Sequence, residues 1–226
     1  PNLEVIVVND GSTDDTDKII KSYISKFKDK NIEFIYLKQE NSGAAGAINN
    51  GLKYVKGDYL TWPDSDDVLT PDSISKKVQF LESNPKYGFV KTDAKIFDEK
   101  DLKVPIGYLS KKSKNRFNED LFEDFVYEKN NVYFAPGCYM VRMSAFLDVN
   151  PNRSIYVTKG GQNWQMLLPI SNKYKCGYID EALYYYIVRK NSHSHASDGI
   201  FQKEIQKIDN YLDVLKNVLN EMNLTK

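Results

Sequence analysis

The chain has 226 residues, and its 31 basic side chains balance its 31 acidic ones, so the formal net charge is zero. This balance argues against a nucleic-acid-binding protein that depends on a basic surface, because neutralising phosphates requires an excess of positive charge. Hydrophobic residues make up 41% of the chain and charged residues 27%, as in globular proteins. The longest apolar runs fall far short of the roughly 18 residues of a membrane-spanning helix, and no signal peptide is visible.

Two further features bear on the compartment and on the start of the chain. Cys138 and Cys176 are the only cysteines, so we expect two small buried thiols, no disulfide framework and a reducing compartment. The chain begins at Pro1 rather than at an initiator methionine. We therefore expect that a segment upstream has been removed or left out.

The first half predicts alternating strands and helices. The β-branched run from Leu3 to Val8 has the pattern of a parallel strand covered on both faces, and turn-forming residues follow it. The further elements expected here are a helix at 14–27, a strand at 32–37, a helix at 44–55, a short strand at 58–62 and a helix at 71–81 capped by Thr70. This alternation implies parallel strands joined by right-handed crossovers.

Beyond Tyr87 the expected segments become shorter. Extended segments are predicted at 88–97, 132–135, 137–141, 176–179 and 183–189, with helical stretches at 119–127 and 163–168. The tail from Phe201 to Leu219 predicts an amphipathic helix. No linker or repeat divides the chain, so we expect one domain, 1–226, whose halves share one sheet. Within it we assign 1–110 to the nucleotide-sugar side, 111–200 to the acceptor side and 201–226 to the C-terminal helix.

Carboxylates gather where two of the expected strands end. Asp10 follows the first strand, and the run Asp64-Ser65-Asp66-Asp67 follows the strand at 58–62. The carboxyl ends of parallel strands share one edge of a sheet, so both acidic turns are expected to face one crevice. Three carboxylates within four residues repel one another unless a cation lies among them, and hard divalent ions prefer oxygen ligands. The alternative is a simple Asx turn before a capped helix.

The order and spacing of these motifs resemble glycosyltransferase family 2, which has the GT-A fold. The resemblance covers Asn2 to about Ser194. The matching segments are VVNDGSTD at 7–14, NSGAAGAINNG at 41–51, KGDYL at 56–60 leading into the D-x-D element DSDD at 64–67, FAPGC at 134–138, and YYYIVR at 184–189 with His193 and Ser194. Each motif alone is weak, but their combination is specific.

The resemblance implies an α/β GT-A fold, a mostly parallel sheet flanked by helices. It implies a bacterial enzyme of surface-polysaccharide or glycolipid synthesis, which transfers a sugar from a nucleotide donor, usually a UDP-sugar, to an acceptor hydroxyl with inversion. The implied cofactor is Mn²⁺ or Mg²⁺, which stabilises the departing diphosphate. The implied partners are the donor and a glycan or lipid-linked acceptor, in the cytoplasm or at the inner face of the membrane. The donor sugar, the acceptor and the oligomeric state stay open.

The resemblance also implies roles for individual residues. Asp10 would contact the uracil, Asp64 the ribose or a metal-bound water, and Asp66 the metal, which makes Asp66 part of the catalytic unit. Ser12, Asn41, Gly43 and Arg189 are implied on the donor side, and His193 joins Asp64 and Asp66 as a metal ligand. His193 and His195 are the only histidines, in a Ser-rich loop, and the alternative is that both are merely solvated.

Two departures from the family pattern concern the donor site. The family begins with an apolar strand ending in V-P-x-Y-N and a helix, so its first strand is expected to be missing from this chain. Ala44 and Ile48 stand where members often carry Arg or Lys. The metal and other cations would then meet the diphosphate charge. Arg189 is the best candidate among only four arginines, although it could equally form a surface salt bridge.

A third departure concerns the catalytic base. Gln162 and Asn163 stand where the family commonly has a Glu-Asp pair, and an amide takes up no proton at neutral pH. These amides could orient an acceptor hydroxyl while Trp164 stacks on a sugar; alternatively, Asn163 caps the helix and Trp164 packs in the core. Asp93 and Asp198 are the candidate substitute bases.

Two other functions stay open at this point. The first is a nucleotide-sugar-binding module without turnover, because the acidic pair is replaced or because the first strand is missing. The second is a sugar nucleotidyltransferase, which would want a glycine-rich basic phosphate loop near its start. No such loop is visible in this sequence.

Overall fold

The computed structural model describes residues 2–110, 113–158, 160–189 and 200–222. In chain order, the elements are β1 Glu4–Asp10, α1 Thr16–Asp29, β2 Glu33–Gln39, α2 Gly43–Leu52, β3 Tyr59–Leu60, β4 Val68–Leu69, α3 Ser73–Ser83, β5 Tyr87–Asp98, β6 Gly107–Tyr108, α4 Phe122–Val126, a 3₁₀ turn Pro136–Cys138, β7 Tyr139–Arg142, α5 Met143–Val149, α6 Gln162–Lys173, β8 Lys175–Val188 and α7 Ile200–Glu221. The expected α/β fold with flanking helices and a C-terminal helix is confirmed.

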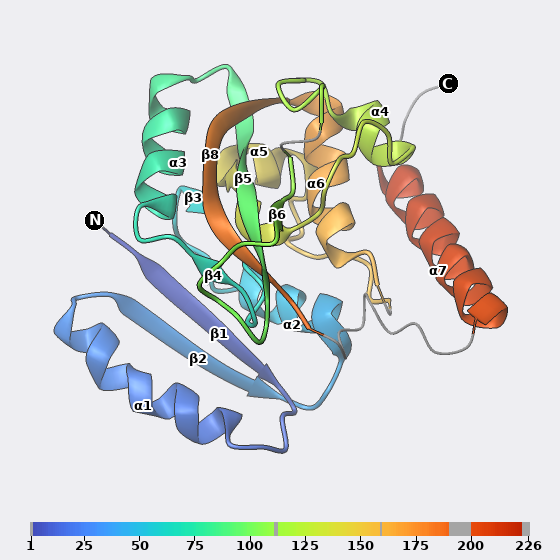
Figure 1. Cartoon of the computed structure of the whole chain (residues 1–226). Coiled ribbons are helices and arrows are strands. Elements are labelled where there is room, and N and C mark those ends of the chain that lie inside the picture. The colour runs from blue at the N-terminus through green and yellow to red at the C-terminus, as the bar shows by residue number, and fades with distance from the viewer. Residues whose placement is uncertain (1, 111–112, 159, 190–199, 223–226) are drawn as a thin grey trace.

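The strands form two sheets (Figure 1). β1 and β2 are a parallel pair, and the other strands form a mixed sheet in the order β3-β7-β5-β8-β4, with β6 paired to β5. In this second sheet β5 and β8 run parallel, whereas β7 and β4 run antiparallel to their neighbours. The pairing is therefore more mixed than expected. Among the described strands β1 pairs only with β2, so the expectation that both halves share one sheet is wrong.

The two sheets are connected by side chains and by packing instead of by a strand ladder. A carboxylate oxygen of Glu4, Oε1, accepts hydrogen bonds from the backbone N–H groups of Lys56 (2.8 Å) and Gly57 (2.7 Å), just before β3. Asn49 on α2 exchanges two hydrogen bonds with the backbone of Ile155. These polar contacts join the first unit to the rest of the molecule.

The main core lies on one face of the six-stranded sheet. Phe89 and Val141 point to this face, where α4, α5 and α6 cover it and the Val214 side of α7 packs against them. Val90 and Met140 point to the opposite face, where α3 packs (Figure 1). The alternation along β5 and β7 is that of a sheet covered by helices on both sides.

Several local expectations are wrong. Residues 132–135 form no strand and lead into the Pro136–Cys138 turn, and the two segments expected at 176–179 and 183–189 are one long strand, β8. Thr70 does not cap α3: the N-cap position is Asp72, and the Thr70 hydroxyl donates to the Asp72 carboxylate (2.8 Å). Helix α5 and the short strands β4 and β6 were not expected, because each is too short to show a periodic pattern.

The first strand is less covered than its sequence predicts. Val5 to Val8 are all only partly buried, and no residue of α1 is fully buried. The reason is that β1 has one neighbouring strand among the described residues and not two. Among those residues, no helix combines the length and the apolar character that crossing a membrane requires.

Candidate functional site

The turn after β1 is built around Asp10. Its Oδ1 accepts hydrogen bonds from the backbone N–H of Ser42 (2.9 Å) and from Nε2 of Gln39 (2.8 Å). Burial acts to raise the pKa of Asp10, but these hydrogen bonds outweigh it and hold the pKa below its ordinary value. Asp10 is therefore a fixed carboxylate at neutral pH, at the point where β1, the end of β2 and the start of α2 meet.

The other residues predicted for this turn lie around Asp10. The amide of Asn41 donates to the Asp10 backbone oxygen (3.0 Å), and the Ser12 N–H donates to the side chain of Asn9 (2.9 Å). Gly11 has φ +76°, and a Cβ there would lie 2.8 Å from the Asn41 nitrogen, so this close approach requires glycine. Gly43 opens α2, also with a positive φ of 78°. The structure brings these residues together, and their ligand stays a prediction.

Asp67 fastens the D-x-D loop to β8. Its two carboxylate oxygens accept hydrogen bonds from the Tyr184 hydroxyl (2.7 Å) and from the Ile187 backbone N–H (2.8 Å). Burial raises the pKa of Asp67 in spite of these bonds. The Tyr184 ring is fully buried against Gly137, where an added Cβ would lie 2.0 Å from the ring. Asp67 thus belongs to the scaffold of the loop.

Asp64 and Asp66 are the carboxylates that this scaffold leaves for a ligand. Packing of protein atoms around the Asp64 carboxyl, together with the negative charges of Asp67 and Asp66, raises the pKa of Asp64 to about 6. Asp66 lies opposite Arg189, with 3.7 Å between Oδ2 and Nε, and both side chains are about half-exposed. A cation bound here would relieve the repulsion among the carboxylates.

The donor set fits a divalent ion that is shared with a ligand. In the described part of the chain, no three His, Cys, Asp or Glu side chains converge to hold a metal by themselves, and His193 lies outside the described residues. Mg²⁺ is commonly bound through one or two carboxylates plus substrate phosphates and waters. Asp64 and Asp66 can supply that protein share, next to the guanidinium of Arg189.

The start of α6 lies beside the strand that leads into the D-x-D loop. The Asn163 side-chain oxygen accepts a hydrogen bond from the Trp62 indole N–H (3.2 Å), two residues before Asp64. Gly161, with φ +71°, occupies the N-cap position of α6, so the expectation that Asn163 caps the helix is wrong. Gln162 is partly exposed at the first helical position, and its role stays a prediction.

Trp164 is a core residue. It is 2% exposed, donates its indole N–H to the Phe125 carbonyl (3.0 Å) and stacks on Tyr211 with ring centroids 4.6 Å apart. The alternative in which Trp164 packs in the core is confirmed, and stacking of this indole on a sugar is wrong because the ring is covered on all sides.

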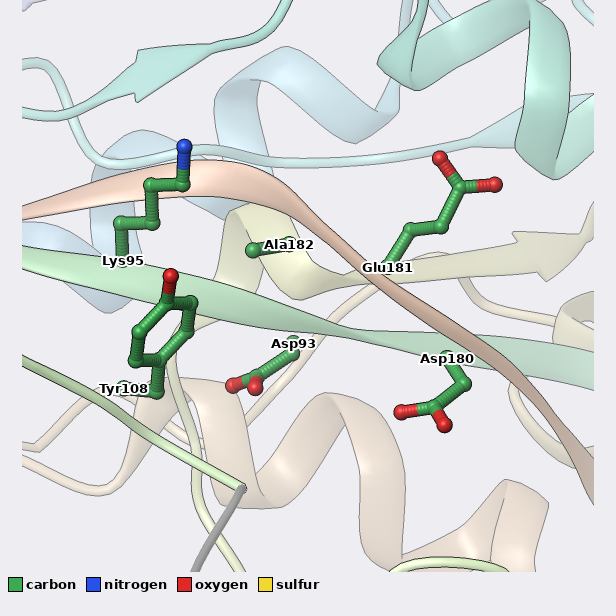
Figure 2. Close-up of a pocket in the computed structure, with 6 residues that line it drawn as sticks. All are labelled: Asp93, Lys95, Tyr108, Asp180, Glu181 and Ala182. Carbon is green, nitrogen blue, oxygen red and sulfur yellow. The ribbon is translucent and has the colours of Figure 1, made fainter.

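Asp93, a candidate base, is buried beside a different part of β8. Its Oδ1 accepts hydrogen bonds from the backbone N–H groups of Ala94 and Ser110, both at 2.8 Å. The side chain lines a hollow between β5, β6 and β8 (Figure 2). No hydrogen bond or ion pair connects Asp93 with the D-x-D loop among the described contacts, so its catalytic role stays a prediction. Asp198 lies outside the described residues.

Sequence reasoning missed the residues that support the D-x-D loop. Lys77 on α3 is completely buried, and its ammonium donates to the Gly137 carbonyl in the turn that packs on Tyr184. Burial lowers the pKa of Lys77 to about 8. The spacing of Ser73, Lys77 and Leu81 puts them on one helix face, which could have predicted the burial. No signal in the sequence pointed from Lys77 to Gly137 or from Tyr184 to Asp67.

An α/β fold with one acidic turn after β1 and a D-x-D loop after β3 defines the GT-A class of sugar-transferring proteins. The sequence profile described as Glycosyl transferase family 2 matches residues 1–149. The chain therefore belongs to glycosyltransferase family 2.

Individual relatives agree with this assignment. The minor teichoic acid biosynthesis protein GgaB of Bacillus subtilis is 25% identical over 228 residues, which is 96% of this chain and 23% of GgaB. The crystal structure of S. aureus TarS 1-349 in complex with UDP-GlcNAc matches with a TM-score of 0.65 and 20% identity, over 98% of this chain and 59% of that one.

A third similar protein comes from an archaeal source. The mannosyltransferase PcManGT from Pyrobaculum calidifontis, in complex with GDP-Man and Mn²⁺, has a TM-score of 0.60 and 16% identity, over 96% of this chain and 55% of that one. The structural similarities confirm the expected fold. The chain spans between 23% and 62% of the lengths of three curated relatives.

Proposed function

We propose that the protein transfers a sugar from a nucleotide-sugar donor, a UDP-sugar, to an acceptor hydroxyl in polysaccharide or glycolipid synthesis. The observation that carries the proposal is the D-x-D loop. Asp67 holds this loop on β8, and the loop presents Asp64 and Asp66 beside Arg189. Membership of glycosyltransferase family 2 supports it. The similar TarS and PcManGT structures hold UDP-GlcNAc and GDP-Man, which are ligands of this class.

The residues divide the donor between two turns. The Asp10 carboxylate, an acceptor fixed by Ser42 and Gln39, suits the N–H groups of a nucleobase. Arg189 suits the diphosphate, because a guanidinium carries a permanent charge and a planar set of donors that matches phosphate oxygens. Asp64 and Asp66 would hold Mn²⁺ or Mg²⁺, which supplies charge stabilisation to the leaving diphosphate when it is bound.

Transfer with inversion is a single displacement at the anomeric carbon. The acceptor oxygen forms the new bond to that carbon, the bond to the diphosphate oxygen breaks, and the acceptor proton must pass to a base. Gln162 and Asn163 cannot accept this proton. Asn163, held by Trp62, can instead orient the acceptor hydroxyl. Asp93 is the remaining described candidate for the base.

The second candidate function is a nucleotide-sugar-binding module without turnover. The observation that favours it is the amide pair at the start of α6, because Asn163 is tied to the Trp62 indole and neither amide is a base. Both readings share the donor site and differ only in the chemical step.

The setting of the reaction is part of the same proposal. We assign residues 1–226 to one glycosyltransferase domain and expect a glycan or lipid-linked acceptor. In the described part of the chain both cysteines are free and buried, which fits a reducing compartment such as the cytoplasm, with the inner membrane face as the place of a lipid-linked acceptor.

A turnover assay separates transfer from binding. The protein is incubated with Mn²⁺ and, in turn, UDP-glucose, UDP-galactose and UDP-N-acetylglucosamine, and the release of UDP is measured. We expect release from one donor, abolished in Asp66→Ala and kept in Asp101→Ala, an exposed aspartate of the turn after β5. UDP binding without release from any donor would support the binding module and contradict turnover.

A further inference from the structure

We propose that the hollow between β5, β6 and β8 is a binding subsite for an uncharged sugar unit of the acceptor. The hollow has a volume of about 310 Å³ and is lined by Asp93, Lys95, Tyr108, Asp180, Glu181 and Ala182 (Figure 2). Ligand sites in proteins begin at roughly 300 Å³, so this volume suits one sugar ring and not a larger group. The inference rests on the proposed function, because it names the acceptor class of the same enzyme.

The hollow is built by an irregularity in the sheet. The pairing of β5 with β8 shifts register on both sides of Asp93, opposite Ala182. Such bulges re-aim side chains and are frequent beside active sites. The backbone N–H groups of Ala94 and Ser110 fix the Asp93 carboxylate, which is 3% exposed, so it cannot swing away. A rigid buried acceptor thus forms one wall of the hollow.

The lining offers hydrogen bonds without net charge. Glu181 is paired with Lys76, and Asp180 with Arg116 (3.6 Å between Oδ1 and Nε). Lys95 stands in the hollow with Asp93. The three carboxylates are therefore matched by three cations. Sugar hydroxyls can donate to carboxylates and accept from an ammonium, whereas a phosphate or a carboxylate group would meet three like charges.

An aromatic ring completes the lining. Figure 2 shows the ring of Tyr108 standing beside Asp93, with its hydroxyl toward Lys95. Aromatic rings present a flat apolar face next to polar groups, and this combination matches the mixed apolar and hydroxyl surface of a sugar.

The position along β8 connects the hollow with the D-x-D loop. Ala182 lies two residues before Tyr184, whose hydroxyl holds Asp67. Two residues of a strand span about 7 Å. An acceptor chain that runs along β8 can therefore place one sugar in the hollow while its reactive end lies near the loop.

The test is a titration followed by ligand-observed NMR. The probes are three neutral methyl glycosides, of glucose, galactose and N-acetylglucosamine, with glucuronic acid and glycerol 3-phosphate as anionic probes. We expect at least one neutral glycoside to bind and both anions to bind more weakly. In the double variant Lys95→Met/Asp180→Asn, the affinity for that glycoside should fall about tenfold, the loss expected for one or two hydrogen bonds.

The controls separate the subsite from the donor site. Glu123→Gln, an exposed change on α4, should bind the glycoside as the unchanged protein does. Binding of UDP with Mn²⁺ is measured on the same samples. If UDP binds but no neutral glycoside does, or if the double variant keeps full glycoside affinity, the subsite is refuted and the proposed function stands. If the glycoside responds as expected but UDP does not bind, the proposed function fails instead.

Discussion

The β1–β2 unit and the six-stranded sheet each carry one acidic turn, but they hold it by different means. In the first unit, β1 is only partly buried, α1 has no fully buried residue, and Asp10 is fixed by hydrogen bonds from Ser42 and Gln39. In the six-stranded sheet, Asp67 is fixed by the phenol of Tyr184, a residue of the fully buried core. The nucleobase-side turn thus depends on local polar contacts, and the D-x-D loop depends on the core.

This difference predicts how each turn responds to damage. Hydrophobic stabilisation scales with the apolar area removed from water, so the six-stranded sheet supplies most of the free energy of unfolding. Changes in its core should disturb the D-x-D loop and the whole fold together. Changes in the β1–β2 unit should cost less free energy of unfolding and remain local.

The largest expected contrast is between two phenylalanines. Phe125 on α4 is 0% exposed, and Phe27 on α1 is only partly buried against Phe34. Phe125→Ala should lower the free energy of unfolding by about 4 kcal/mol, as for fully buried aromatic residues, and Phe27→Ala by about 1 kcal/mol. Urea denaturation followed by circular dichroism measures both. Equal losses would show that the two regions are equally well packed.

The next expected effect comes from crowding Tyr184. In Gly137→Ala the added methyl group would lie 2.0 Å from the ring, so the ring or the Pro136–Cys138 turn must move. We expect a loss of about 3 kcal/mol in the free energy of unfolding, at the upper end for overpacking. Gly160→Ala is the matched control, since a Cβ there has no neighbour within 4 Å. If both variants unfold at the same urea concentration, the packing around Tyr184 is looser than described.

A smaller effect is expected from removing the hydroxyl that holds the loop. Tyr184→Phe leaves Asp67 without one of its two hydrogen bonds, at a cost of about 2 kcal/mol for a bond to a charged group. The metal-dependent affinity for UDP should fall as well, because the loop loses its anchor. Tyr185→Phe, the next residue along β8, serves as the control. Unchanged UDP affinity in Tyr184→Phe would mean that Asp67 does not position the loop.

The smallest effect is a pH dependence in the β1–β2 unit. The pKa of Asp10 is lowered by folding, so its hydrogen bonds stabilise the fold above its ordinary pKa of about 4, and this contribution is lost as the pH falls through the lower value. Asp10→Asn should therefore be less stable by about 0.5 kcal/mol at pH 7, since the turn is solvated. The difference should vanish in acid. Denaturation midpoints at pH 7 and pH 3 check it, and a gap that widens in acid would reverse the sign.

Local sequence patterns predicted the β-α-β elements of the first half well, because Ile19, Tyr23 and Phe27 mark a helix and turn residues end each strand. The positions of Asp10 and the D-x-D loop at strand ends also followed from the sequence. The pairing of β5 with β8 could not be predicted, since partners so distant in the chain leave no periodic signal. For the same reason the contacts of Asp67 with Tyr184 and of Lys77 with Gly137 emerged only from the structure.

The burial of the first strand shows the limit of patterns most clearly. The run Val5 to Val8 predicted coverage on both faces, and the structure leaves these residues partly exposed. An apolar run reports what a strand can bury, and its neighbours decide how much it does bury. The same holds for Trp164, whose position beside a candidate site suggested a sugar contact although the ring packs in the core.

The central claim is that the D-x-D loop binds a nucleotide diphosphate together with a divalent ion through Asp66. Calorimetric titration of the protein with UDP, with and without Mn²⁺, tests it most directly, with Asp66→Ala and Asp101→Ala run in parallel. We predict UDP binding that requires Mn²⁺, is lost in Asp66→Ala and is retained in Asp101→Ala. UDP binding that is independent of Mn²⁺, or equally strong in Asp66→Ala, would contradict the account.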